Sequence, residues 1–385
     1  LYLSTRFRGT STSLSVNPFT LKTQSGSLQL KAQAKVADWG KLPRWKATIE
    51  KLQVSDEGMK LIATNLGSKA KIPEQVLRLG NLYYKGVASG RGVRDIASRG
   101  ELHTDVGNVR LDGEKSGQQL RAHIDTRGIN LGKILDNDKF GLVAADLTAS
   151  GTTRNLAAKG AIQQFDFNKY SFRNIQLDGS YNQGLVSGQA SIADPNVQLS
   201  VKGKYSIPKK QYDATLDLAH LQPSVLGMKM ADKTYTLNDI RVSAKNEGSD
   251  SYLDLEAPFA RIHVDGKYDY ATLVKSFNNL VASKLPTLPG IGKLDKSADN
   301  HFLFQLELTS TEFLQRMFGI PLHLSQPVRA DGFLNDREHT ANLYADIPGF
   351  AYNGSAYNGG LVRLNTYNDT LLVDARIQKG EMGDN

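Results

Sequence analysis

Apolar and polar residues alternate along most of the chain with a period of two, which is typical of β-strands whose two faces meet different surroundings. The alternation is clearest between residues 160 and 220. Val197, Leu199 and Val201 share one parity there, and Asp194-Pro195-Asn196 predicts a turn before them. The pattern predicts an all-β protein built as an elongated, antiparallel β-repeat sheet with one apolar face and one wet face.

The parity of the apolar residues changes once within this segment. Tyr170 and Phe172 share one parity, whereas Ile175 and Leu177 share the other. A β-bulge between the two pairs is the simplest explanation, because one extra residue restores the apolar side chains to the same face.

Asp-Gly pairs suggest an internal repeat. They occur at residues 112–113, 178–179, 265–266 and 331–332, each after an apolar-x-apolar pattern, and are separated by 66, 87 and 66 residues. Two of the three intervals are equal, which favours a repeat array. Asp-Gly is also common at strand ends, so the four pairs could instead mark strand ends without an internal repeat.

Helix signals are short and lie between groups of strands. Pro73 stands where a first helical residue is expected and Gly80 where a helix would stop. Similar signals predict short helical insertions in five places: 72–79, 130–135, 223–228, 271–285 and 311–318. Strands are not separated by regular long helices, so a doubly wound α/β fold is disfavoured.

The composition removes several kinds of stabilisation and chemistry. The chain has no Cys, which excludes disulfides, thiolate metal sites and a Cys nucleophile. No apolar run approaches the ~20 residues that span a bilayer. The formal charge of +8 contains no block of five or six like charges, so we expect it to be spread along solvated strand faces and predict no nucleic-acid partner.

Motifs for catalysis and cofactor binding are incomplete. The seven His residues include no closely spaced pair for a metal, and no Gly-x-Ser-x-Gly elbow occurs. The glycine-rich segments 90–95 and 290–294 lack the third Gly and the Ser or Thr that nucleotide loops require. Asp254 and Glu256 share a strand face, as acids on a solvated face often do. We predict that the protein is not an enzyme and that it binds neither a cofactor nor a metal ion.

Three segments resemble the repeats of bacterial TamB proteins, especially those of Bacteroidetes, which are related to AsmA-like bridge proteins. Residues 129–135 lead into Phe140-Gly141 and a new strand, and the two longer segments are residues 72–86 and 160–181. Their sequences are INLGKIL, IPEQVLRLGNLYYKG and GAIQQFDFNKYSFRNIQLDGSY. The resemblance covers most of residues 60–280.

The resemblance implies a sheet curled into a U-shaped trough, a β-taco, that belongs to a periplasmic segment of an inner-membrane-anchored protein of a Gram-negative bacterium. Residues 1–385 would be one continuous β-repeat segment of a larger envelope protein. Its expected function is outer-membrane biogenesis, in which the trough shields phospholipid acyl chains between the two membranes. An Omp85-type, TamA-like outer-membrane protein would bind through regions outside this chain.

The trough would be lined by the apolar residues of one strand parity. A β-sandwich would bury the same residues against a second sheet, and the pattern alone leaves both possible. The candidate acyl-binding residues are Phe165, Phe167, Phe172, Ile175, Leu177, Val186, Ala190, Ile192, Val197, Leu199, Val201, Leu216, Leu218, Ile262, Val264, Phe302, Phe304, Leu306 and Leu308.

Two other functions fit the same pattern. A scaffold for outer-membrane protein translocation or assembly would pair its strand edges with an incoming strand by β-augmentation. A polysaccharide-binding or polysaccharide-cleaving β-helix would need clusters of aromatic and acidic residues on an exposed face.

Overall fold

The computed structural model describes residues 1–38, 42–65, 73–152, 154–269, 272–284, 299–367 and 370–380. The chain divides into two compact units. Unit 1 comprises Leu1–Gln183 and Gly188–Asp194, and unit 2 comprises Gly184–Ser187 and Pro195–Asn385.

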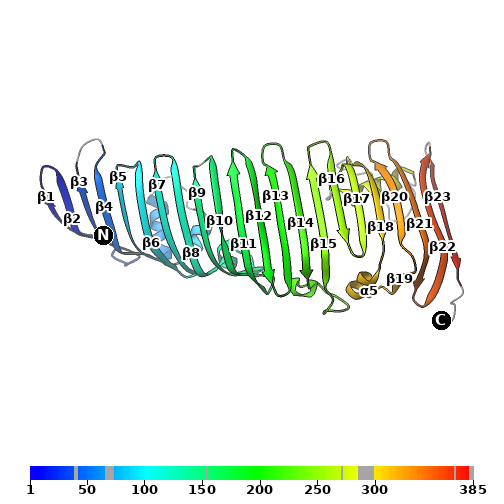
Figure 1. The fold of residues 1–385 in the computed structure, drawn as a ribbon. Helices are drawn as coiled ribbons and strands as arrows, with labels where there is room; N and C mark the ends of the chain where they lie inside the picture. Colours follow the sequence, from blue (N-terminus) through cyan, green and yellow to red (C-terminus); the bar gives the residue numbers. More distant parts are fainter. Residues whose placement is uncertain are drawn as a thin grey trace. The chain divides into compact units, whose positions relative to one another are not determined.

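Unit 1 is an open antiparallel sheet whose strands follow one another in sequence order (Figure 1). Each strand from β1 to β11 pairs with the next, and helices lie between β4 and β5 and between β8 and β9. The strands are β1 (Tyr2–Gly9), β2 (Ser13–Lys22), β3 (Leu28–Ala37), β4 (Arg44–Val54), β5 (Leu82–Arg91), β6 (Asp95–Thr104), β7 (Gly107–Ser116), β8 (Gln119–Asn130), β9 (Phe140–Gly151), β10 (Asn155–Phe167) and β11 (Tyr170–Asn182). Strand β12 (Leu185–Asp194) is divided between the units.

Unit 2 is also an open antiparallel sheet. Successive strands pair from β13 to β18, and β20, β21, β22 and β23 continue the order, while the short β19 pairs with one end of β21. The strands are β13 (Val197–Ser206), β14 (Gln211–Leu221), β15 (Leu237–Asn246), β16 (Ser251–Ala257), β17 (Ala260–Lys267), β18 (His301–Leu308), β19 (Leu322–Leu324), β20 (Val328–Asn335), β21 (Thr340–Tyr352), β22 (Ser355–Tyr367) and β23 (Thr370–Lys379).

Tight turns with left-handed residues connect several hairpins. Asn168 and Lys169 have φ angles of 50° and 70° between β10 and β11, and Asn353 and Gly354 have 48° and 78° between β21 and β22. Two consecutive residues with positive φ match the right-handed twist of the flanking strands. These turns fix which residues lie opposite each other.

Short helices occur at all five predicted places. They are α2 (Glu74–Leu77), α3 (Leu131–Leu135), the 3-10 helix η1 (Pro223–Leu226), α4 (Leu273–Lys284) and α5 (Glu312–Phe318). Ile72, Ala271 and Leu285, at the limits of the predicted ranges, lie outside the described residues. None of the helices in the described ranges combines the length and apolar character needed to cross a membrane.

Helix α1 (Asp56–Asn65) was not predicted from the sequence. Its start carries a recognisable signal, because the Ser55 hydroxyl accepts a hydrogen bond from the Gly58 amide at 3.3 Å and Asp56 and Glu57 fill the first turn. Gly58 is packed against the backbone carbonyl of Ser27, the residue before β3, and an added Cβ would overlap that carbonyl. The glycine that this contact requires is the residue that weakens the helical pattern.

The prediction of an all-β antiparallel sheet with a few short helices is confirmed. The Asp-Gly pairs lie within β7, β11, β17 and β20, with the aspartates facing the polar side and the glycines the apolar side. The U-shaped curl and the continuity of residues 1–385 as one segment stay predictions.

A buried polar network holds α4 against the sheet of unit 2. Asp336 Oδ2 accepts hydrogen bonds from Ser276 Oγ at 2.5 Å and from the Asn300 amide at 2.8 Å. Asn300 Nδ2 donates to Ser276 Oγ at 2.6 Å. Ser276 and Asn300 are each 1% exposed, so water cannot replace these bonds.

We expect Asp336→Ala to loosen α4 locally. The change leaves the Asn300 amide buried without its acceptor, whereas the Ser276 hydroxyl can still donate to the Thr272 carbonyl. An unsatisfied buried amide costs about 2 kcal/mol. Amide hydrogen exchange within α4 should therefore accelerate about thirtyfold. Exposed Glu338→Ala is the control and should leave exchange unchanged. Unaltered exchange in Asp336→Ala would mean that the network does not hold the helix.

Candidate functional site

The register of unit 2 places the predicted residues of this unit on one face. Leu199 pairs with Leu218, Val201 with Leu216, Ile262 with Leu306, and Val264 with Phe304. Intervening strands contribute residues that were not predicted but follow the same alternation: Ile240, Val242, Leu253 and Leu255. The apolar face of unit 2 comprises these four with Val197, Leu199, Val201, Leu216, Leu218, Ile262, Val264, Phe302, Phe304, Leu306 and Leu308.

The apolar face of unit 1 includes an aromatic cluster on β9, β10 and β11. Phe165 pairs with Phe172 across the strands, and their ring centroids lie 6.3 Å apart. Phe167 and Phe140 lie 5.2 Å apart, and Tyr170 meets Phe172 edge-on at 4.9 Å. Phe140 was not among the predicted residues, although it begins a segment predicted to be a strand.

The predicted change of parity in β11 is present. Asn174 has a φ of 55°, and Phe172 and Ile175 on either side are both 7% exposed. The register of β10 with β9 shifts opposite this point, between Ile162 and Gln164. The irregularity therefore keeps apolar side chains buried on both sides of it.

Asp166 anchors the polar side of the same region. Burial by itself raises the pKa of this carboxyl, but hydrogen bonds from Ser171, Gln164 and the Leu142 amide outweigh it and lower the pKa. Ser171 Oγ donates at 2.6 Å and Gln164 Nε2 at 2.9 Å. The charged carboxylate thus links β9, β10 and β11 beside the aromatic cluster.

Most of the predicted residues are half-buried. In unit 2, Val197 and Leu218 are buried, Val186 is exposed, and the other nine predicted positions retain intermediate exposure. In unit 1, Phe165, Phe167 and Leu177 are half-buried, as are Ala190 and Ile192 of β12. A second packed sheet would bury such residues more completely, so this exposure favours an open face over a closed sandwich core.

Aromatic rings lie over glycines on this face. A Cβ added to Gly100 would lie 2.5 Å from Tyr84 Cε2, and one added to Gly332 would lie 2.9 Å from Phe304 Cε1. The rings cover backbone that glycine leaves bare. Part of the burial of the apolar face therefore comes from its own aromatic side chains, without a second sheet packed against it.

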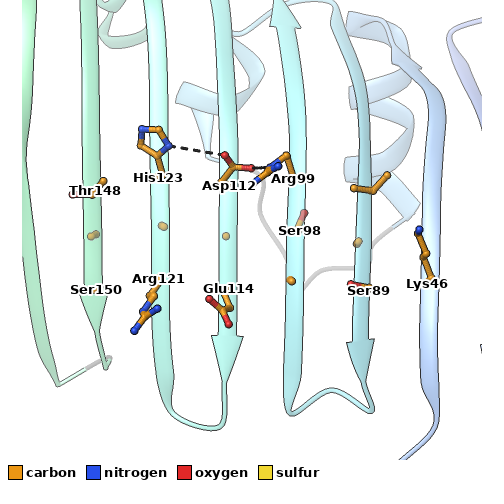
Figure 2. Close-up of a pocket in the computed structure, with 16 residues that line it drawn as sticks. Lys46, Ser89, Ser98, Arg99, Asp112, Glu114, Arg121, His123, Thr148 and Ser150 are labelled. Carbon is orange, nitrogen blue, oxygen red and sulfur yellow. Dashed lines mark hydrogen bonds and ion pairs between the residues drawn. The ribbon is translucent and has the colours of Figure 1, made fainter.

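The opposite face, which we call the polar face, carries ion pairs in rows across the strands. In unit 1, Arg99 contacts Asp112 at 2.6 Å, and His123 lies 4.0 Å from Asp112 (Figure 2). His123 also lies 2.9 Å from Asp146. Arg99, Asp112 and His123 line a hollow of about 730 Å³. Figure 2 shows them on the near side of the strands, with helices behind.

Unit 2 has a longer row of this kind. Charges alternate in sign across six neighbouring strands, with Arg241 at 2.7 Å from Asp217 and Glu307 within 3.3 Å of two arginines. The row consists of Asp217, Arg241, Glu256, Arg261, Glu307 and Arg329. Two further hollows of about 510 and 540 Å³ lie against it.

The acid pair noted in the sequence belongs to this surface. Asp254 contacts His263 at 2.7 Å, and Glu256 lies between Arg241 and Arg261 in the row. Both acids therefore lie on the polar face among polar and basic neighbours. Across the described ranges, no cluster of three or more His, Asp or Glu residues is arranged to hold a metal ion.

Comparison with known proteins identifies no relative. No family model matches the chain, and neither a curated protein nor a solved structure matches it.

Substitution of Leu216 distinguishes an open face from a closed core. Leu216 is half-buried between Val201 and Val242, so in Leu216→Asp the carboxylate can reach water. We expect a loss of about 1–2 kcal/mol of stability, from apolar contact alone, with cooperative melting retained.

The matched control is Thr215→Asp, one residue away and opposite Lys202 on the polar face. It should melt within about a degree or two of the unsubstituted protein, as surface substitutions usually do. Loss of cooperative melting in Leu216→Asp alone would indicate that the face is a closed core, because an unpaired buried charge costs far more.

Proposed function

We propose that the apolar face of this sheet binds phospholipid acyl chains and shields them from water as they pass between two membranes. The chain would be a periplasmic segment of an inner-membrane-anchored protein of the TamB type, acting in outer-membrane biogenesis. The observation that carries the proposal is the half-exposed apolar face that the register builds from consecutive strands.

The chemistry of the face suits an acyl chain. The predicted positions of unit 2 carry only Val, Leu, Ile and Phe side chains, so a bound chain would meet no partner for a headgroup. Removing a methylene group from water is worth about 0.8 kcal/mol, wherever along a uniform apolar surface it lies. An acyl chain can therefore move along such a face without losing much of this free energy.

The division between faces supports the same function. Ion pairs keep the polar face hydrated in both units, so the sheet can expose an apolar face on one side only. Proteins rarely leave a large apolar surface exposed unless it binds something.

Photo-crosslinking at adjacent residues tests the proposal. Phe304 is half-buried on the apolar face, whereas neighbouring Gln305 is exposed on the polar face and lines one of its hollows. Benzoylphenylalanine at position 304 replaces a similar ring, so it should not disturb the fold. Because it lies on the apolar face, it should capture phospholipid in cells. The same group at position 305 should capture little, because successive residues of a strand face opposite sides.

Two outcomes would contradict acyl-chain binding. Equal lipid capture at both positions would mean that the probe reports general membrane proximity. Capture of unfolded outer-membrane polypeptide at position 304, without lipid, would favour the assembly scaffold that pairs with incoming strands.

A further inference from the structure

The excess positive charge of the chain is concentrated in its first strands. Residues 1–54 contain nine Lys and Arg against two Asp and Glu, a formal charge of +7 out of the total of +8. The expectation that the charge is spread along the chain is therefore wrong. No run of like charges reveals the concentration, because strand alternation places apolar residues between the basic ones.

The register gathers these charges on one face. Arg8 lies opposite Ser15, Ser15 opposite Lys35, and Lys35 opposite Lys46. All belong to the polar face, away from apolar-face residues such as Val16. The basic residues of this cationic face are Arg6, Arg8, Lys22, Lys31, Lys35, Arg44, Lys46 and Lys51, and Figure 2 includes Lys46 at its border.

Two pairs of lysines lie directly opposite each other, Lys35 with Lys46 and Lys31 with Lys51. Like charges in this position destabilise a sheet. Glu50 relieves the second pair by contacting Lys31 at 2.6 Å. Lys35 and Lys46 are both exposed, and within the described part of the chain neither contacts a carboxylate.

In the row from Asp217 to Arg329, each described charge lies beside an opposite one. Unit 1 has a like-charge pair, Asp125 opposite Asp146, but Arg110 lies 3.9 Å from Asp125 and His123 lies 2.9 Å from Asp146. The cationic face differs, because among the described residues Lys35 and Lys46 have no such partner, which costs stability. Such departures from local consistency are expected at binding surfaces.

We propose that the cationic face of β1 to β4 docks onto a bilayer surface of anionic phospholipid. The charge is complementary to that surface, and each Lys or Arg near it strengthens binding about fivefold. Among the facing residues of β1 to β4, only Tyr2, opposite Lys22, carries an aromatic ring. The face therefore lacks the row of rings on which single-stranded nucleic acids stack. The choice of a membrane rests on the proposed function, because a sheet that carries lipid must meet one.

Flotation with lipid vesicles tests the docking surface. The full chain should float with vesicles of equal parts phosphatidylglycerol and phosphatidylcholine, and not with phosphatidylcholine alone. Raising the salt concentration should weaken the binding, because salt screens charges on an exposed face. Lys35→Gln combined with Lys46→Gln should lower the association constant about twentyfold or more.

The matched control combines Lys159→Gln with Lys202→Gln. These two lysines are exposed strand residues outside the cationic face, so the control removes the same net charge. It should change the association constant less than threefold. The Lys35/Lys46 variant should melt no lower than the unsubstituted protein, because its change removes a repulsion, and this separates lost binding from lost folding.

Three results would overturn the docking proposal: equal loss of binding in both double variants, equal flotation with uncharged vesicles, or preference for duplex DNA over anionic vesicles at equal phosphate. Its failure is distinct from failure of acyl-chain binding. Lipid capture at position 304 without vesicle binding removes only the docking surface, and vesicle binding without lipid capture removes only the acyl-chain proposal.

Discussion

Successive side chains of each paired antiparallel strand point to opposite faces of the sheet, and this alternation determines the chemistry of both faces. A slip of one residue would carry every apolar side chain of a strand to the polar face. In unit 2 the register keeps Val201, Leu216 and Val242 in one row, and the next strands extend it through Leu255 and Ile262. The two faces can then differ in chemistry although neither is packed against a second sheet.

The ion-pair rows and the apolar face depend on the same register. Asp217 and Arg241 face each other only when Leu216 faces Val242, because the two pairs are adjacent in one ladder. A slipped strand would lose the ion pair as well as the apolar contact. The cationic face gives up part of this protection, since Lys35 opposite Lys46 repels in the native register.

Periodicity was sufficient to predict the strands and their apolar residues, because a period of two is a local property. The turn after Asp194 and the insertions at Asn130 and Thr311 were predicted for the same reason, from residues that end or begin elements. Helix α1 was missed because close packing requires Gly58 within it. The cationic face was missed because it depends on which lysines lie opposite each other, and single strands do not contain that information.

Native mass spectrometry of protein purified without detergent can detect lipid bound to the apolar face. We expect adducts with the masses of phospholipids, reduced in Leu216→Asp and retained in Thr215→Asp. Lipid must then lie against the apolar face, because the control places the same charge on the other side of the sheet. A bare protein mass, or adducts equally abundant in both variants, would show that this face does not bind phospholipid.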